Sequence, residues 1–189
     1  MNIYFRHFLS IPITKTDKFS GWIIYPVGDL IAQLILGDVS FLRLLIITLV
    51  GRYIYAIETP KWFGFLATWK TNTEPKGWVR FFWDEHLGKY YFNWITKSVG
   101  STFWFHPIWI ARHMLVLELA NILTGQTSLL EFLPQALKLG TASFIMQFPV
   151  AILVNYIIIC RVKPETRFIW ASIFSGLLSI YYAVMLVYF

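Results

Sequence analysis

The chain has 189 residues, of which 57% are hydrophobic and only 14% are charged, whereas about 25% of an average soluble domain is charged. Its mean hydropathy of +0.59 and its nine Trp, ten Tyr and seventeen Phe exclude intrinsic disorder and a coiled coil. The net charge is +6, but the basic residues are scattered between apolar runs, so we expect no nucleic-acid partner. The composition is typical of a polytopic membrane protein.

The first 20 residues form a basic N-terminal segment that contains Arg6, Lys15 and Lys18. Their one apolar run, residues 8–13, is short and is broken by Pro12, so we expect no cleavable signal peptide.

Five apolar stretches follow, and each is long enough for the roughly 20 residues that a membrane-spanning helix needs. They cover residues 21–37, 41–69, 90–123, 139–160 and 168–189. We therefore predict an all-α integral membrane protein, a single domain over residues 1–189 with a bundle of about five transmembrane helices. Four spans are the alternative. The third stretch is too long for one straight span, and we expect a kink or a break at Pro107.

Two longer connections separate these stretches. Residues 70–89 are predicted to form a polar loop followed by an interfacial amphipathic segment, because aromatic and charged residues alternate there. Residues 125–138 are predicted to hold a short amphipathic helix. The N-terminal segment and the connections before the third and the last stretch are basic, which places them on the cytoplasmic or matrix side and the C-terminus on the other.

Ionisable residues inside spans are costly when they face lipid, so they turn inward, pair or line water. Asp29 and Gln33 lie four residues apart on one helical face, next to a small face made by Gly28 and Ala32 that would let another helix approach. Arg52 is the candidate partner of Asp29. These groups form either a polar lining for a solute or an interhelical ion pair, and the ion-pair interpretation is favoured because such pairs can specify register without transport.

The sequence contains no pattern that indicates catalysis or a cofactor. His106 and His113 are seven apart, on nearly one face of a helix, but no carboxylate or cysteine at a matching spacing supports a metal or haem site. The one cysteine, Cys160, excludes a disulfide framework and a thiolate cluster. Arg112 and Glu118 point to different faces. We expect no enzyme activity and no cofactor, since the motifs of hydrolases, metalloproteases and phosphate-binding loops are all missing.

The segment GWIIYPVGDLIAQ, residues 21–33, resembles the N-terminal signature of the Mpv-seventeen family, which includes the twenty-two-kilodalton peroxisomal membrane protein. Other matches follow in order along the chain: Arg43, Gly51, Trp62, Phe63, Leu66, Lys97, Pro107, Phe148, Pro149, Asn155, Tyr156, Pro164 and Arg167. The chain departs from the family pattern in a longer loop between Trp62 and Lys97 and in Ser101 and Thr102, which replace an acidic–glutamine pair. Phe148 also stands where the family usually has Trp, and the spacing from Asn155 to Pro164 is longer. Residues 102–111 also have some similarity to small bacterial alanine exporters.

The resemblance implies a small helical bundle of the mitochondrial inner membrane, or of a peroxisomal or bacterial membrane, whose relatives have been proposed to form weakly selective channels for small solutes. Excess positive charge along a polar path would favour anions. The candidate path, or buried ion-pair network, consists of Asp29, Gln33, Arg52, Lys97 and Arg112. A five-helix bundle is thin, so we expect a homo-oligomer.

The alternative function is that of a non-catalytic structural subunit in a large mitochondrial inner-membrane complex, with other membrane subunits as partners. In either case the basic connections would attract anionic lipid headgroups, cardiolipin included. The candidate lipid-binding residues are Lys76, Arg80, Lys89, Arg161, Lys163 and Arg167.

Overall fold

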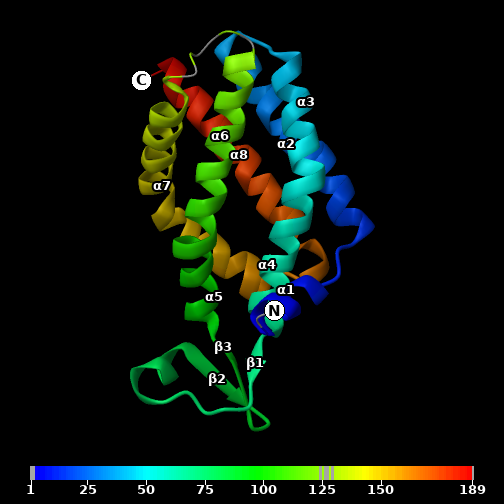
Figure 1. Ribbon diagram of the computed structural model, residues 1–189, viewed down its shortest axis with the longest axis vertical. Helices are drawn as coiled ribbons and strands as arrows, with labels where there is room; N and C mark the ends of the chain where they lie inside the picture. The colour runs from blue at the N-terminus through cyan, green and yellow to red at the C-terminus, as the bar shows by residue number, and fades with distance from the viewer. Residues whose placement is uncertain (1–2, 124, 126–127, 129, 189) are drawn as a thin grey trace.

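The computed structural model describes residues 3–123, 125, 128 and 130–188, without the side chains of Gln135 and of residues 182–188. The chain is mostly helical, which confirms the all-α prediction for the body of the molecule (Figure 1). The α-helices are α1 (Ile3–Ser10), α2 (Lys15–Leu36), α3 (Phe41–Val50), α4 (Ala56–Thr68), α5 (Trp94–Gly100), α6 (His106–Leu123), α7 (Phe132–Tyr156) and α8 (Arg167–Tyr188).

Short π-helical turns extend or connect several of these helices without ending the helical run. They are η1 (Gly51–Tyr55), η3 (Ser101–Phe105) and η4 (Ile157–Arg161). Because Pro107 cannot donate a backbone hydrogen bond, a π turn in the residues before it relieves the mismatch. The irregularity predicted at Pro107 takes this form.

The five long helical runs overlap the five apolar stretches, although α2 and α7 begin earlier than predicted and residues 90–92 of the third stretch belong to β3. Two runs among the described residues, Lys15–Leu36 and Phe132–Arg161, are long and apolar enough by length and composition to cross a membrane. The separate amphipathic helix predicted within residues 125–138 is wrong from Phe132 onward, because those residues are the first turns of α7. Residues 124, 126, 127 and 129 of that segment lie outside the described residues.

Local capping chemistry sets the ends of the first long helix. Thr14 and Asp17 form a capping box at the start of α2: the Asp17 amide donates to Thr14 Oγ1 over 3.0 Å, and the Thr14 amide donates to Asp17 Oδ2 over 2.9 Å. Gly37, with φ of +78°, ends α2 in the left-handed conformation that glycine adopts without strain. Ser40 then caps α3, so that α2 and α3 form a tight antiparallel hairpin.

Glycines let α2 approach its neighbours closely, as predicted for its small face. A Cβ atom on Gly28 would lie 2.8 Å from the Cα atom of Gly176 in α8. At the other end of α2, a Cβ atom on Gly51 would clash with the carbonyl oxygen of Gly21. These backbone contacts hold α2 between η1 and α8, around a buried cluster of Tyr25, Ile47, Tyr55, Ala56 and Phe168.

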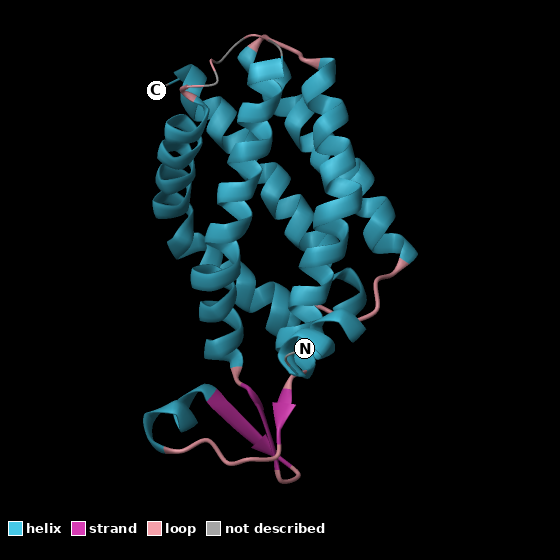
Figure 2. Cartoon of the chain, viewed as in Figure 1, coloured by secondary structure: helices cyan, strands magenta, loops and turns pink. Residues whose placement is uncertain are grey.

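A small antiparallel sheet lies at one end of the bundle, where the sequence predicted an interfacial amphipathic segment (Figure 2). Its strand order is β1 (Lys70–Thr71), β3 (Lys89–Phe92) and β2 (Trp83–His86), and the 3-10 helix η2 (Gly77–Phe82) precedes β2. Leu87 and Gly88 both have positive φ and form a two-residue hairpin turn. The sequence prediction missed this hairpin because Leu is an uncommon residue in such a turn.

The two ends of the bundle differ in charge. Helix α1, the sheet and the connection at residues 162–166 lie at one end, the lower end in Figure 1, and we name it the basic end. The hairpin at residues 37–40, the end of α6 and the start of α7 lie at the opposite end. All three segments that were predicted to share one side of the membrane are therefore at the same end.

Candidate functional site

A cavity of about 470 Å³ lies between α2, α3, α6, α7 and α8, and we name it the central cavity. Most of its wall is apolar and comes from Ala32, Leu36, Trp109, Ile110, Met114, Leu117, Leu139, Ala142, Met146 and Leu178. Polar side chains converge on the same space: Asp29, Arg43, His106, His113, Glu118, Asn121, Ser143, Gln147, Ser175 and Ser179. A mostly apolar wall with a few convergent polar groups is typical of a small-molecule site.

Asp29 and Arg43 of this wall form a network with the buried side chain of Gln33. Arg43 Nη2 lies 2.5 Å from Asp29 Oδ1, and Arg43 Nε donates to Oδ1 and Oδ2 over 3.0 and 3.2 Å. Gln33 Nε2 donates to Asp29 Oδ2 over 2.6 Å, which confirms that the two residues share a helical face. The amide of Ser40 in turn donates to Gln33 Oε1 over 2.6 Å, so the network also holds the hairpin between α2 and α3.

The predicted pairing of Asp29 with Arg52 is wrong. The hairpin places Arg43 beside Asp29, and Arg52 lies nine residues farther along the run, roughly 13 Å away at 1.5 Å per residue. The guanidinium of Arg52 instead lies over the rings of Trp22 and Tyr53, 5.0 and 5.6 Å from their centroids. Arg52 therefore belongs to the outer surface of the bundle and not to a polar path through it.

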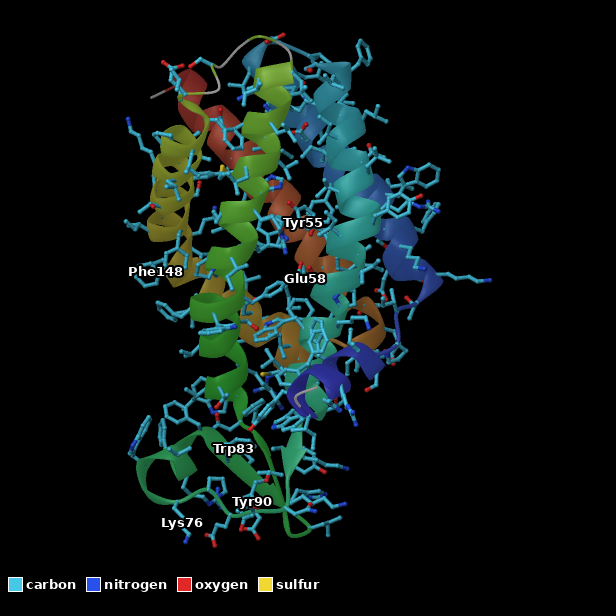
Figure 3. All side chains as sticks on the ribbon, viewed as in Figure 1. Tyr55, Glu58, Lys76, Trp83, Tyr90 and Phe148 are labelled. Carbon is cyan, nitrogen blue, oxygen red and sulfur yellow. The ribbon has the colours of Figure 1, made fainter. Side chains whose placement is uncertain are left out.

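Helix α6 contributes a ladder of stacked rings to the central cavity. His106, Trp109 and His113 follow one another at helical spacing, with nearly parallel rings 6.3 Å and 5.0 Å apart. His106 Nε2 bonds Gln147 Oε1 over 3.2 Å, and His113 Nδ1 bonds the hydroxyl of Tyr55 over 3.0 Å. Figure 3 shows Tyr55 in the interior of the bundle. The described residues contain no group of three or more His, Cys, Asp or Glu side chains that could hold a metal ion.

Glu118 is the most deeply buried carboxylate on this wall, with only 3% of its surface exposed. Asn121, one turn farther along α6, donates to its Oε1 over 3.3 Å. Its other oxygen, Oε2, has no hydrogen-bond partner among the described residues. Glu118 thus lines the central cavity, and none of the ion pairs among the described residues includes it.

A smaller cavity of about 40 Å³ continues toward the basic end and shares His106, Trp109 and Ser175 with the central cavity. Asn155 also lines it and donates to Thr102 Oγ1 over 3.0 Å. The hydroxyl oxygen of Thr59, another lining residue, is buried and has no hydrogen-bond partner among the described residues. The three shared side chains therefore lie between the central cavity and this smaller one.

The remaining members of the predicted path lie away from both cavities. Arg112 Nη1 lies 2.6 Å from Oε2 of Glu58, so the excess of unpaired cations inferred from the sequence is wrong for Arg112. Glu58, labelled in Figure 3, belongs to α4, and the 54-residue separation of the pair gave no sequence signal. Lys97 is half-buried on α5. The structure brings only Asp29 and Gln33 of the predicted set together.

The six candidate lipid-binding residues all lie on segments at the basic end. Arg80 donates to the Trp83 carbonyl over 2.7 Å, lies 3.4 Å from Glu85 and covers the ring of Tyr90. Arg161 bonds the Tyr156 hydroxyl. The other four are Lys76, Lys89, Lys163 and Arg167, of which the three lysines are exposed. Figure 3 places Lys76 at the outer edge of the sheet region.

Of the polar side chains that line the central cavity, the sequence reasoning named only Asp29 as a site residue, and Arg43, Glu118 and Gln147 are among those that it missed. Arg43 is the first cation after the turn that follows Asp29. A hairpin between the first two apolar stretches would have predicted a contact between Arg43 and Asp29. Glu118 gave the general signal of an ionisable residue inside an apolar stretch, and Gln147 gave none, because the chain pattern does not show which helices enclose a cavity.

No protein-family model, no curated protein and no solved structure matches the chain. The resemblance to the Mpv-seventeen family therefore rests on the residues quoted for it, and the functional interpretation rests on the geometry of the bundle.

Proposed function

We propose that the chain is an integral membrane protein with five spans, and that its central cavity takes a small solute as part of a channel or carrier. The observation that carries this proposal is the central cavity itself, a space of about 470 Å³ with polar side chains directed into the middle of a helical bundle. Leu36, Leu139 and Met146 line this space and are also exposed, so the cavity is open to the outside of the bundle.

The outer surface of the bundle supports a membrane location. Large apolar side chains point outward along several helices, and Phe41 is 82% exposed, Trp104 68% and Leu153 59%. In water each such side chain would forgo roughly 1.5–3 kcal/mol of burial, whereas in lipid the exposure has no such cost. The helical run over residues 41–68 is also long enough for a hydrocarbon core of about 30 Å.

The two cavities support a path along the bundle axis. The central cavity lies toward the end that holds the hairpin at residues 37–40, and the smaller cavity leads toward the basic end. A solute on this path would then pass His106, Trp109 and Ser175 between the two cavities. Hydrogen-bonding groups on both sides of these residues could replace part of the hydration shell of a polar solute.

The family resemblance and the charge asymmetry support an organelle membrane, with the mitochondrial inner membrane as the proposed site. In that setting the basic end faces the matrix or the cytoplasm, following the positive-inside rule. Its cations would then contact anionic lipid headgroups, each contributing about 1 kcal/mol near the surface.

The test is the permeability of liposomes that contain the purified protein, measured with glycerol by stopped-flow light scattering. Ala142 lines the central cavity, and Ala142→Phe is expected to return glycerol permeability to that of protein-free liposomes. The matched control is Leu153→Phe, which changes an outward-facing residue of the same helix and should leave the permeability unchanged. Equal permeability of wild type and Ala142→Phe would exclude the central cavity as the path.

The proposed subunit role makes a different prediction for the protein extracted from its own membrane in mild detergent. A channel is expected to run as a small homo-oligomer, which native mass would show. Recovery only within a much larger assembly, together with no glycerol permeability in liposomes, would favour a structural subunit.

A further inference from the structure

The charges that line the central cavity do not balance. Asp29 and Arg43 form a close ion pair and cancel each other. His106 and His113 are engaged by Gln147 and Tyr55. Glu118 is the one carboxyl group of the lining that is left without an ion-pair partner among the described residues. Only 3% of its surface is exposed, and its Oε2 has no described hydrogen-bond partner.

An unpaired buried carboxylate is strongly unfavourable, because its charge has lost water and gained no cation. Asn121 satisfies only one oxygen, over 3.3 Å. An unpaired Glu118 therefore lowers the free energy of unfolding of the ligand-free protein. Because Glu118 lines a cavity large enough for a small molecule, a bound ligand that pairs with it would restore this stability.

The chemistry of the wall limits what that ligand can be. The anion preference expected from Arg52, Lys97 and Arg112 is not supported by the cavity, since none of the three lines it. An anion would be repelled by Glu118, and a divalent metal would find no cluster of three ligating side chains among the described residues. The single carboxylate of Glu118 therefore suits a ligand with one positive charge.

The rest of the cavity is suited to an apolar group. Met114, Leu117 and Met146 line it together with Glu118, and thioether and leucine side chains adapt to varied apolar shapes. We propose that Glu118 binds the ammonium group of a monovalent organic amine whose apolar body occupies the central cavity. This inference rests on the proposed solute-binding role of that cavity and names its substrate class.

The experiment is isothermal titration of the full-length protein in nanodiscs of zwitterionic phospholipid, with empty nanodiscs as the baseline. Three probes share one aromatic ring and differ in charge: benzylammonium, benzyl alcohol and benzoate. We expect wild type to bind benzylammonium at least about tenfold more tightly than benzyl alcohol, as a hydrogen bond to a charged group provides, and to bind benzoate least. Ala142→Phe should abolish binding of all three.

Glu118→Gln keeps the shape of the side chain and removes its charge, so it should lower benzylammonium affinity to that of benzyl alcohol. Glu165→Gln, at an exposed position of the basic end, removes the same charge elsewhere and should have no effect. The Tm of each protein is a second readout, which shows whether the variant is folded. Without ligand, Glu118→Gln should have a higher Tm than wild type. Benzylammonium should raise the Tm of wild type but not that of Glu118→Gln.

The outcomes separate the two proposals. Equal affinity for benzylammonium and benzyl alcohol, unchanged in Glu118→Gln, would overturn the amine specificity and leave the cavity as a solute site. Tighter binding of benzoate would overturn the charge argument in the same way. If no probe binds wild type, the amine specificity is wrong, and the glycerol permeability of wild type and Ala142→Phe decides the solute-binding role separately.

Discussion

Replacing one member of the Asp29–Arg43 pair is predicted to destabilise the bundle more than replacing both. The Asp29 carboxylate accepts three contacts from Arg43 and one from Gln33, and the two side chains of the pair are 9% and 22% exposed. Breaking a buried pair costs about 3–5 kcal/mol because one charge is left uncompensated. We expect the upper part of this range for Arg43→Met, which strands the more buried carboxylate.

Asp29→Asn should cost less, about 2–4 kcal/mol, because the stranded guanidinium keeps some contact with solvent. The double variant should lose far less than the sum of the two single losses, which corresponds to a coupling free energy of at least about 2 kcal/mol. The measurement is equilibrium unfolding of the detergent-solubilised protein, followed by helical circular dichroism, in a double-mutant cycle.

Arg52→Met supplies the matched control, because it removes a cation of the same helical run that does not contact Asp29. Its loss of the contact with Trp22 should cost about 0.5–1 kcal/mol, and this loss should add to that of Asp29→Asn without coupling. Additive losses for positions 29 and 43, or coupling between positions 29 and 52, would refute the reasoning.

Three further predictions concern packing, a buried hydrogen bond and topology. Gly28→Ala should lower the free energy of unfolding by about 1–3 kcal/mol, because the added methyl group overpacks against α8. Gly100→Ala, whose Cβ would meet nothing within 4 Å, should instead raise it by up to about 1 kcal/mol. Thermal unfolding of the two variants in detergent compares them, and equal effects would contradict the close approach of α2 to α8. Tyr55→Phe should cost about 1–3 kcal/mol, because the buried imidazole that it bonds is left unsatisfied, and a change within error in denaturant unfolding would refute this. In a background with Cys160 replaced by Ser, cysteines at Lys76 and Leu130 should react with a membrane-impermeant maleimide from opposite sides of the membrane, and labelling from the same side would reject the five-span topology.

The helices of this protein could be predicted from local patterns. Each of the five apolar stretches is long enough to form a helix. Caps such as the Thr14–Asp17 box and Gly37 depend on residues three or four apart. The contact between Asp29 and Gln33 follows from the same periodicity. Such features are determined within one turn of helix, so the amino-acid order contains them directly.

The sheet was not predicted, because its strands lack the local pattern that identifies the helices. Residues 83–92 pair through main-chain hydrogen bonds, and their side chains show no clean alternation, since three of the four residues of β2 are exposed. A turn through Leu87 and Gly88 requires positive φ at a residue that rarely adopts it, so nothing in the local sequence predicted a hairpin.

The sequence by itself determined the five long helical runs and which connections are basic, because these properties follow from side chains that are close along the chain. Only the tertiary structure decided that Arg43 and not Arg52 pairs with Asp29, that Arg112 meets Glu58, and that Glu118 faces a cavity. Each of these contacts depends on how separate helices are placed against one another. That placement is set by many weak packing contacts, such as the approach of Gly28 to Gly176, whose combined effect no single stretch of sequence contains.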